Sequence, residues 1–363
     1  MPGWGIFGTK RHVKPIFVGS YGNDFTRGIY VFHIDIDNGE LLKKKYYKSP
    51  ANPVAFYKRE RFIYVCYLNN TGRATDGGLW QYANMDLQFG LASRVYNQGK
   101  TFIDSFVNED RTYAYAVDYY NSEVVVMPIL KQKIVKVTQI IKHEGKGLDE
   151  RKQTQAHPCF IEETPDHQNI FVCDLGTDEV VLYDLIENGQ LQRNDEKTIH
   201  LTPGSGPKKM IFDASGKFAY ILNELSSTVC VYAYENGHFT FLQEFDTYPK
   251  DKYNDDNLAG DIVYSKQEDK DILFVSNRGH DSVSVFELDK KTGLATYVEF
   301  LDTDQNPRSM ILVLNRWLVV ASQKGGTLET FEIRMNEGKG FLFETHFSYS
   351  VSEPVCLIEG RGI

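Results

Sequence analysis

A short apolar segment that ends in small or polar residues recurs seven times along the chain. The copies are FVGSYG from Phe17, YVCYLN from Tyr64, YAVDYY from Tyr115, FVCDLG from Phe171, YILNEL from Tyr220, FVSNRG from Phe274 and VVASQK from Val319. Successive copies begin 47, 51, 56, 49, 54 and 45 residues apart, so they fill the 363-residue chain. A period of about fifty residues indicates a repeat architecture in which each unit is one piece of supersecondary structure.

Each unit carries the sequence signals of four strands. The recurrent segment is followed by a turn and an alternating strand, as in GIYVFHI (28–34), EVVVMPI (123–129), EVVLYDL (179–185), TVCVYAY (228–234) and SVSVFEL (282–288). A glycine turn and one more strand come next, as in DNGEL (37–41), ENGQL (187–191), ENGHF (235–239) and KTGLA (291–295). An apolar segment, often opened by proline, precedes the copies, as in NPVAF (52–56), HPCFI (157–161), GPKKM (206–210) and NPRSM (306–310). Alternation rich in β-branched and aromatic residues is typical of half-buried strands.

Seven such units without a helical period predict an all-β fold, a seven-bladed β-propeller of four-stranded blades. Radial repetition of this kind leaves only short, protected sheet edges. The last segment, EPVCLIEG (353–360), is an inner strand without a blade of its own, and we expect it to pair with the N-terminal blade and close the ring. Residues 15–363 are therefore predicted to form a single propeller, preceded by a short extension at residues 1–14.

The composition limits the partners of this propeller. A net charge of −9 argues against nucleic acid and anionic membranes, because both are bound through clustered Lys and Arg. Five cysteines without a C-x-x-C pair indicate free thiols in a reducing compartment. The N-terminus lacks the apolar core of a signal peptide, and no apolar run approaches the roughly 20 residues that span a bilayer. We therefore expect a cytoplasmic protein.

Several stretches resemble the propeller-type lactonase family. IFVGSYGNDFTRGIYVFHIDIDNGEL (16–41) resembles its first blade, and HEGKGLDERKQ (143–153) with AHPCFIEETPDHQNIFVCDLGTDEVVLYD (156–184) is similar to its fourth. GSGPKKMIFDASGKFAYILNELSSTVCVY (204–232) resembles the fifth, SNRGHDSVSVF (276–286) the sixth and NPRSM (306–310) the seventh. The resemblance implies a seven-bladed propeller that hydrolyses 6-phosphogluconolactone or, in a fungal branch, cyclises carboxymuconate to a lactone. It implies neither a metal nor an organic cofactor.

The central cavity of such a propeller is the predicted site, because equivalent positions of the repeat lie side by side around the axis. The residue after the inner-strand proline is Val54, Cys159, Lys208 or Arg308, depending on the blade. The next strand ends near Glu224 in one blade and near Arg278 and His280 in another. We expect the following side chains to meet in one place: Lys208, Lys209, Arg278, Arg308, Glu224 and His157.

Hydrolysis of a lactone requires a general base and positive charge where the oxyanion forms. We therefore predict Glu224 as the base and Arg278 and Lys208 as the groups that stabilise the oxyanion or hold a carboxylate. A phosphorylated lactone also needs cations for its phosphate. The remaining substrate-binding candidates are Lys209, Arg308, His157, Cys159 and His280, with Lys209 and Arg308 assigned to the phosphate. Structural roles stay open for all of them, such as a capped turn for the carboxylate or an inter-blade ion pair for the arginines.

The chain departs from the family pattern at two places. Cys159 stands where the family has a second His of the fourth blade, and Lys208-Lys209 replaces Arg-His in the fifth. Lys keeps the charge of Arg but not its planar fork. Cys for His removes an acid/base with a pKa near neutrality, and a thiolate replaces it only where neighbouring cations depress the thiol pKa. A small buried side chain is the favoured interpretation of Cys159.

Other chemistry is disfavoured by the sequence. The nine His and five Cys lack zinc-ligand spacing, and the acidic segment with Asp251, Asp255 and Asp256 lacks the pattern of a calcium loop. Three hypotheses follow for function. The first is a cofactor-free hydrolase of a small anionic lactone, most simply 6-phosphogluconolactone. The second is a related propeller acting on another lactone or a muconate-like acid, and the third is a non-catalytic propeller that binds a ligand or a protein.

Overall fold

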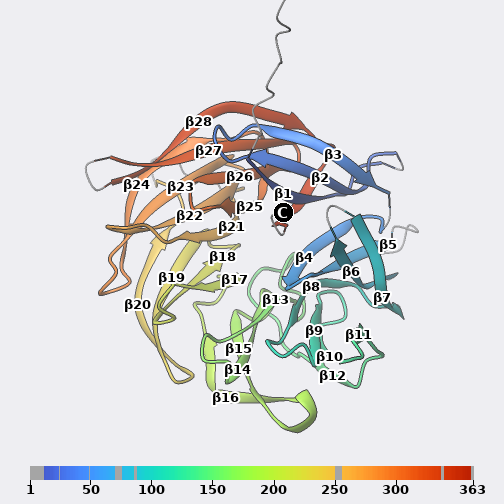
Figure 1. The fold of residues 1–363 in the computed structure, drawn as a ribbon. Coiled ribbons are helices and arrows are strands. Elements are labelled where there is room, and N and C mark those ends of the chain that lie inside the picture. Colours follow the sequence, from blue (N-terminus) through green and yellow to red (C-terminus); the bar gives the residue numbers. More distant parts are fainter. Residues whose placement is uncertain are drawn as a thin grey trace, which may run out of the picture.

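Seven antiparallel sheets are arranged in a ring around a central axis (Figure 1). The computed structural model describes residues 12–23, 25–48, 50–69, 76–85, 88–249, 256–336 and 339–360. Six sheets have four strands; in the third blade, two short strands share the outermost position, where each pairs with β10. The expected seven-bladed, all-β propeller is confirmed. None of the described helical residues forms a helix long and apolar enough to cross a bilayer.

The strands of each blade follow one another from the axis outward. The first blade consists of β29 (Pro354–Glu359), β1 (Val13–Ser20), β2 (Gly28–Asp35) and β3 (Leu41–Tyr47). The second consists of β4 (Pro53–Arg59), β5 (Phe62–Asn69), β6 (Asp76–Met85) and β7 (Gln88–Gln98). The third consists of β8 (Phe102–Val107), β9 (Tyr113–Asp118), β10 (Glu123–Leu130), β11 (Lys133–Ile134) and β12 (Gln139–Lys142). The fourth blade consists of β13 (Pro158–Glu163), β14 (Asn169–Asp174), β15 (Glu179–Leu185) and β16 (Leu191–His200), with a short 3-10 turn, η1 (Glu187–Gly189), between β15 and β16. The fifth consists of β17 (Pro207–Phe212), β18 (Phe218–Asn223), β19 (Thr228–Glu235) and β20 (His238–Asp246). The last two consist of β21 (Leu258–Ser265), β22 (Asp271–Arg278), β23 (Ser282–Leu288) and β24 (Ala295–Asp302); and β25 (Pro307–Val313), β26 (Trp317–Ser322), β27 (Thr327–Asn336) and β28 (Lys339–Ser350).

The ring is closed by the C-terminal strand, as predicted. β29 is the innermost strand of the first blade and runs antiparallel to β1, with Ile16 opposite Glu359 and Gly19 opposite Cys356. Because β1 begins at Val13, it takes in the last two residues of the expected N-terminal extension. Residues 1–11 of that extension lie outside the described part of the chain.

The recurrent segment forms the second strand of every blade, and its first residue packs in the core. These seven residues are exposed by no more than 1%: Phe17, Tyr64, Tyr115, Phe171, Tyr220, Phe274 and Val319. The polar residue that ends the strand fixes the loops at the axis. In the fourth blade, for example, the Asp174 carboxylate accepts hydrogen bonds from the backbone N–H groups of His157 (2.7 Å) and Gly176 (2.9 Å). The apolar start therefore anchors the blade, while the polar end orders the mouth of the ring.

Each innermost strand has an irregularity at the same place, immediately after its start. One extra residue stands between the pairs on either side, as between Pro207–Asn223 and Lys209–Leu222 in the fifth blade. The same shift occurs in the other six inner strands. A β-bulge of this kind redirects a side chain out of the regular alternation of a strand. Each blade thus has, next to the axis, one residue whose side chain does not follow the alternation of its strand.

Candidate functional site

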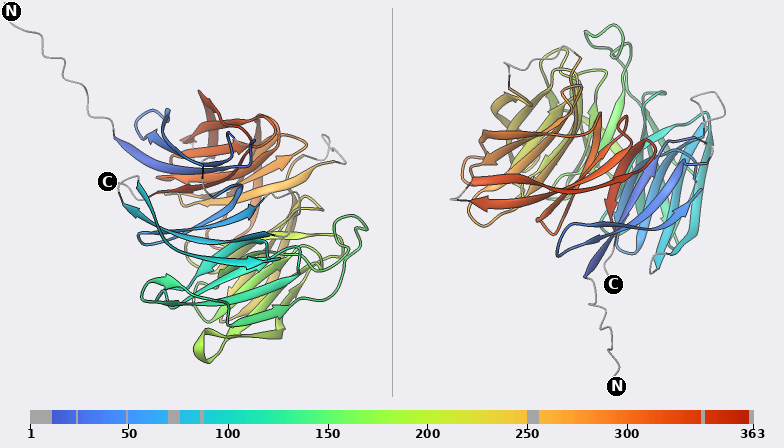
Figure 2. Two further views of the ribbon diagram at one scale, coloured as in Figure 1. Left: turned by 90° about the vertical axis from the view of Figure 1, so that its right-hand side faces the viewer. Right: turned by 90° about the horizontal axis from the view of Figure 1, so that it is seen from above.

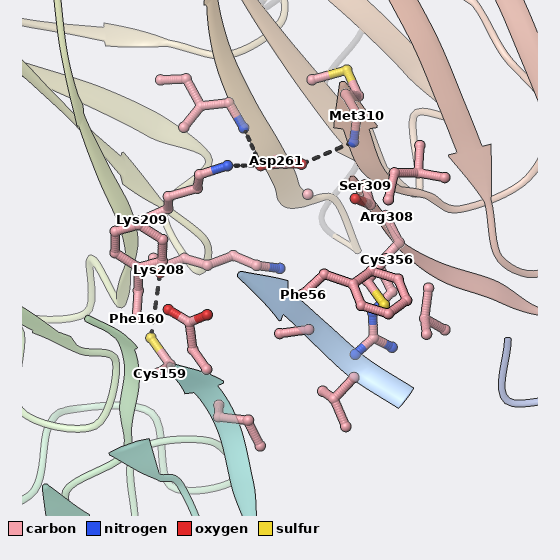
Figure 3. Close-up of a pocket in the computed structure, with 18 of the residues that line it drawn as sticks. Phe56, Cys159, Phe160, Lys208, Lys209, Asp261, Arg308, Ser309, Met310 and Cys356 are labelled. Atoms are coloured by element: carbon pink, nitrogen blue, oxygen red, sulfur yellow. Dashed lines mark hydrogen bonds and ion pairs between the residues drawn. The ribbon is translucent and has the colours of Figure 1, made fainter. Parts of the chain in front are cut away.

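A cavity of about 820 Å³ lies on the propeller axis, and its lining includes two rings of equivalent residues. The inner ring consists of the residues at the bulges: Val355, Val54, Ile103, Cys159, Lys208, Gly260 and Arg308, in blade order. The second ring lies at the ends of the second strands and consists of Tyr21, Leu68, Tyr119, Leu175, Glu224 and Arg278. The first three blades therefore present an apolar wall at the bulges, whereas the cationic residues come from the fifth to the seventh blades. Figure 3 shows Cys159, Lys208 and Arg308 around the same space.

Glu224 is clasped by two cations. Its Oε2 lies 2.8 Å from Nζ of Lys208 and 2.7 Å from Nη2 of Arg278. Its other oxygen, Oε1, receives no hydrogen bond from the described residues. Burial opposes ionisation of this carboxyl, but Lys208 and Arg278 outweigh it and lower the pKa of Glu224 to about 2. The carboxylate is therefore ionised at neutral pH.

Positive charge at this place exceeds the charge of the carboxylate. Burial, helped by Arg278 and opposed by Glu224, lowers the pKa of Lys208 to about 8. A further cation, Lys152 in the loop before β13, also helps to lower the pKa of Glu224. Sequence reasoning missed Lys152, although it lies in the HEGKGLDERKQ stretch (143–153) of the fourth blade. A cluster of this composition is suited to a ligand with more than one negative charge.

Arg308 and Lys209 also reach the cavity, but their partners differ. Arg308 donates from Nη1 to the side-chain carbonyl of Gln323 (2.8 Å), and its guanidinium lies 5.4 Å from the ring centre of Tyr21. Lys209 instead forms an ion pair with Asp261, with Nζ 2.7 Å from Oδ1 (Figure 3). Arg308 thus remains available to an anion, whereas Lys209 already has a carboxylate partner.

Cys159 lines the cavity as a thiol. Its Sγ lies 3.3 Å from the carbonyl oxygen of Pro207 and 3.4 Å from that of Cys173. Burial raises the pKa of Cys159 well above that of a free thiol, and Cys173 and Asp174 add to this effect, against which Lys208 acts weakly. The nearby cation therefore does not produce a thiolate, although the side chain is partly exposed rather than buried as expected from the sequence.

Two of the predicted substrate-binding residues lie outside the residues that line the cavity. The His157 ring stacks on Tyr119 with centroids 4.1 Å apart, and its Nδ1 lies 3.0 Å from the Tyr119 carbonyl oxygen. His280 lies 2.7 Å from Ser282 through Nδ1 and packs between Tyr248 and Phe300. Of the eight predicted residues, the structure brings together Glu224, Arg278, Lys208, Lys209, Arg308 and Cys159.

A relay of hydrogen bonds from Asp178 through Gly206 holds the backbone of Glu224 in place. The Asp178 carboxylate accepts the backbone N–H groups of Gly204 (2.8 Å) and Gly206 (2.7 Å). The carbonyl of Gly206 in turn accepts the N–H of Glu224 at 2.8 Å. Gly206 has a φ of 62°, and a Cβ there would collide with Leu225, so this loop requires glycine. The position of the carboxylate is thus set by backbone that Asp178 holds in place.

Within the described residues, no group of three or more His, Cys, Asp or Glu side chains is arranged to hold a metal ion. Asp251 and Asp255 of the acidic segment lie outside these residues, while Asp256 lies within them.

Known proteins resemble this chain over almost its whole length. The family described as "Lactonase, 7-bladed beta-propeller" matches residues 15–359. The 6-phosphogluconolactonase of Bacillus subtilis is 28% identical over 351 residues, which cover 94% of this chain and 97% of the relative. A protein of Staphylococcus aureus without an assigned function is 31% identical over 358 residues, covering 94% and 98%. The solved structure of the periplasmic gluconolactonase of Pseudomonas aeruginosa superimposes with a TM-score of 0.87 at 26% identity, covering 97% of this chain and 100% of that one.

Proposed function

The chain belongs to the lactonase family of seven-bladed β-propellers, and from this premise we propose that it hydrolyses a sugar lactone that carries an additional anionic group. The observation that carries the proposal is the clasp of Glu224 between Lys208 and Arg278, at distances of 2.8 and 2.7 Å, beside further positive charge. The substrate that fits best is 6-phosphogluconolactone, for which the Bacillus subtilis relative is named. Its phosphate would interact with the positive charge that the Glu224 carboxylate does not neutralise.

The proposed chemistry uses the two cations first. Lys208 and Arg278 bind the carbonyl oxygen of the lactone and stabilise the negative charge that develops there. Once the substrate engages these cations, Glu224 loses part of the interaction that lowers its pKa and becomes a stronger base. Its Oε1, which has no donor in the described residues, is the oxygen that receives the proton of a water molecule.

The proposed hydrolysis consumes one water molecule and needs no cofactor. The water oxygen bonds to the carbonyl carbon as Glu224 takes its proton, and the negative charge moves to the carbonyl oxygen. Collapse of this intermediate breaks the bond to the ring oxygen, which receives the proton from Glu224. The product is the open-chain acid. Arg308, on the wall of the cavity, is proposed to contact the anionic group of the same substrate.

The test compares Glu224→Gln with wild type on freshly prepared 6-phosphogluconolactone, corrected for spontaneous hydrolysis. We expect kcat/KM to fall by about 10²-fold or more, as is usual for loss of a general base. Glu332→Gln is the matched control, because Glu332 also lies between two cations, Arg316 (3.0 Å) and Arg334, but on the outer part of the seventh blade. Wild-type turnover at the background rate would favour a non-catalytic propeller, and equal rates for wild type and Glu224→Gln would remove Glu224 as the base.

Glucono-1,5-lactone is assayed in parallel, because a gluconolactonase is among the similar structures. Turnover of this neutral lactone alone would favour the alternative of a related lactonase with another substrate. We propose the cytoplasm as the location, since all five cysteines are free thiols. Cell fractionation checks this location.

A further inference from the structure

Residues 143–157, here called the strap, connect β12 to β13 and stand out from one face of the ring (the green segment in Figure 2). The strap is tied to the fourth blade at its first residue. The His143 side chain is 1% exposed and lies between Asp174 (Nδ1 to Oδ2, 2.6 Å) and Tyr183 (Nε2 to Oη, 2.5 Å). This end of the strap is therefore held by buried side chains.

A second buried side chain ties down the far part of the strap. Gln153 is 1% exposed, and its Nε2 donates to the carbonyl of Leu175 and to Oδ1 of Asp178, both at 2.8 Å. Leu175 lines the axial cavity next to Glu224 in blade order. The strap is thus fixed against the mouth of the cavity, through the same Asp178 that positions the backbone of Glu224.

Lys152 precedes this buried glutamine and has a constrained backbone. Its N–H donates to Oδ1 of Asp149 at 2.9 Å, and the N–H of Gln153 donates to the Asp149 carbonyl at 2.8 Å. The side chain is half-buried, and burial lowers the pKa of Lys152; Glu224 opposes this shift and Arg278 adds to it. Lys152 forms no ion pair within the described residues. Lys152 thus adds positive charge near a place where Lys208 and Arg278 already share the single carboxylate of Glu224, and a ligand with negative charge would offset this surplus.

We propose that Lys152 is a specificity-determining residue that binds the phosphate of a phosphorylated sugar lactone from the strap. The inference rests on the proposed function and extends it to a residue outside the rings that line the cavity. A phosphate monoester carries about −1.5 to −2 charges at pH 7, which offset the surplus positive charge at the mouth. Lys152 therefore distinguishes phosphorylated from unphosphorylated ligands, whereas Lys208 and Arg278 hold the part that both share.

The test measures binding rather than turnover, with 6-phosphogluconate and gluconate as stable probes in isothermal titration calorimetry. Lys152→Met is expected to weaken 6-phosphogluconate about tenfold, the loss of one charge-assisted hydrogen bond, and to change gluconate less than about twofold. Lys152→Arg should restore most of the affinity, because it keeps the charge. Lys146→Met is the matched control, since Lys146 is an exposed lysine of the same strap, and it should leave both affinities unchanged.

Either of two kinds of result would overturn the inference, one in the variant and one in the wild type. One is an equal loss of both probes in Lys152→Met, or no loss of either. The other is a wild type that binds 6-phosphogluconate no more tightly than gluconate. Because neither probe is hydrolysed, these results are separate from the lactonase assay. A protein that binds as predicted without turning over lactones would retain the phosphate site and lose only the proposed reaction.

Discussion

Gly260 and Arg278 approach so closely that a Cβ added to Gly260 would stand 3.3 Å from Cγ of Arg278. The added atom would also lie 2.5 Å from Oγ of Ser276 and nearer still to the carbonyl oxygen of Pro307. These two atoms are joined by a hydrogen bond of 3.0 Å, so they have little freedom to move apart. In the ring of bulge residues, glycine therefore leaves the opening through which Arg278 reaches Glu224.

Gly260→Ala is expected to displace this part of the ring. Overpacking of a well-packed position costs about 1–3 kcal/mol of unfolding free energy, and the displacement of Arg278 should lower kcat/KM as well. Urea unfolding and lactone hydrolysis measure the two effects. Gly90→Ala is the control, because no atom of the described residues, its chain neighbours aside, lies within 4 Å of the added Cβ at Gly90. A Gly260→Ala protein with wild-type stability and activity would show that the close approach is unimportant.

The pH dependence of activity is predicted to have an alkaline limit set by Lys208. Because burial lowers the pKa of Lys208 to about 8, this cation loses its proton as the pH rises through that value, and kcat/KM should fall. Glu224, with a pKa of about 2, stays ionised and contributes no acid limb between about pH 5 and 7. In Lys208→Arg, the guanidinium keeps its proton and the alkaline limb should move upward. An alkaline limb that is unchanged in Lys208→Arg would assign it to another group.

Cys159→Ala is predicted to retain lactonase activity within a few-fold of wild type. The reason is the raised pKa of this partly buried thiol, which leaves it protonated and unreactive at neutral pH. Steady-state kinetics and the rate of alkylation by iodoacetamide check the two parts of this prediction. Loss of activity in Cys159→Ala, together with fast alkylation that abolishes turnover, would indicate a nucleophilic cysteine.

The fold was predictable because its signals are periodic. An apolar residue at the start of each copy, such as Phe17 or Tyr220, has to be buried for its strand to pack, and the spacing of the copies fixes the number of blades. The meeting of Glu224, Lys208 and Arg278 followed from the same periodicity, since equivalent positions of a radial repeat share the axis. The number of blades and the residues that meet at the axis can therefore be predicted from the repeat.

Features that depend on single contacts were not predictable in this way. His157 follows the periodicity as well as Cys159 does, but its ring turns onto Tyr119 because a flat aromatic partner lies 4.1 Å away. Lys152 belongs to the long loop before β13, whose course the repeat does not determine, and the burial of Gln153 helps to hold it at the mouth. The bulges also escape a pattern analysis, because one extra residue per strand does not alter the order of apolar and polar residues enough to be recognised.

Asp178→Asn is predicted to loosen the mouth of the cavity while leaving the blade intact. The carboxylate accepts hydrogen bonds from Gln153, Gly204 and Gly206, and an amide nitrogen in place of one oxygen faces a donor instead of accepting from it. Asn tolerates the φ of 59° at this position, so the backbone itself gains no strain. We expect a loss of about 1–3 kcal/mol in unfolding free energy and a fall in kcat/KM.

The readout that separates this effect from general destabilisation is hydrogen exchange. Amides of residues 204–206 should exchange faster in Asp178→Asn, because this segment loses an acceptor whichever oxygen is replaced. Amides of the strap should also exchange faster where the amide nitrogen takes the place of Oδ1, which accepts from Gln153. Asp213→Asn is the matched control: Asp213 also accepts from three N–H groups, here all from the backbone, of Ser215, Lys217 and Phe218, at the opposite end of β17. It should lose stability to a similar extent and keep its activity, since the turn it holds lies away from Glu224. Equal losses of activity in the two variants would mean that stability alone, and not the relay from Asp178 through Gly206, governs the site.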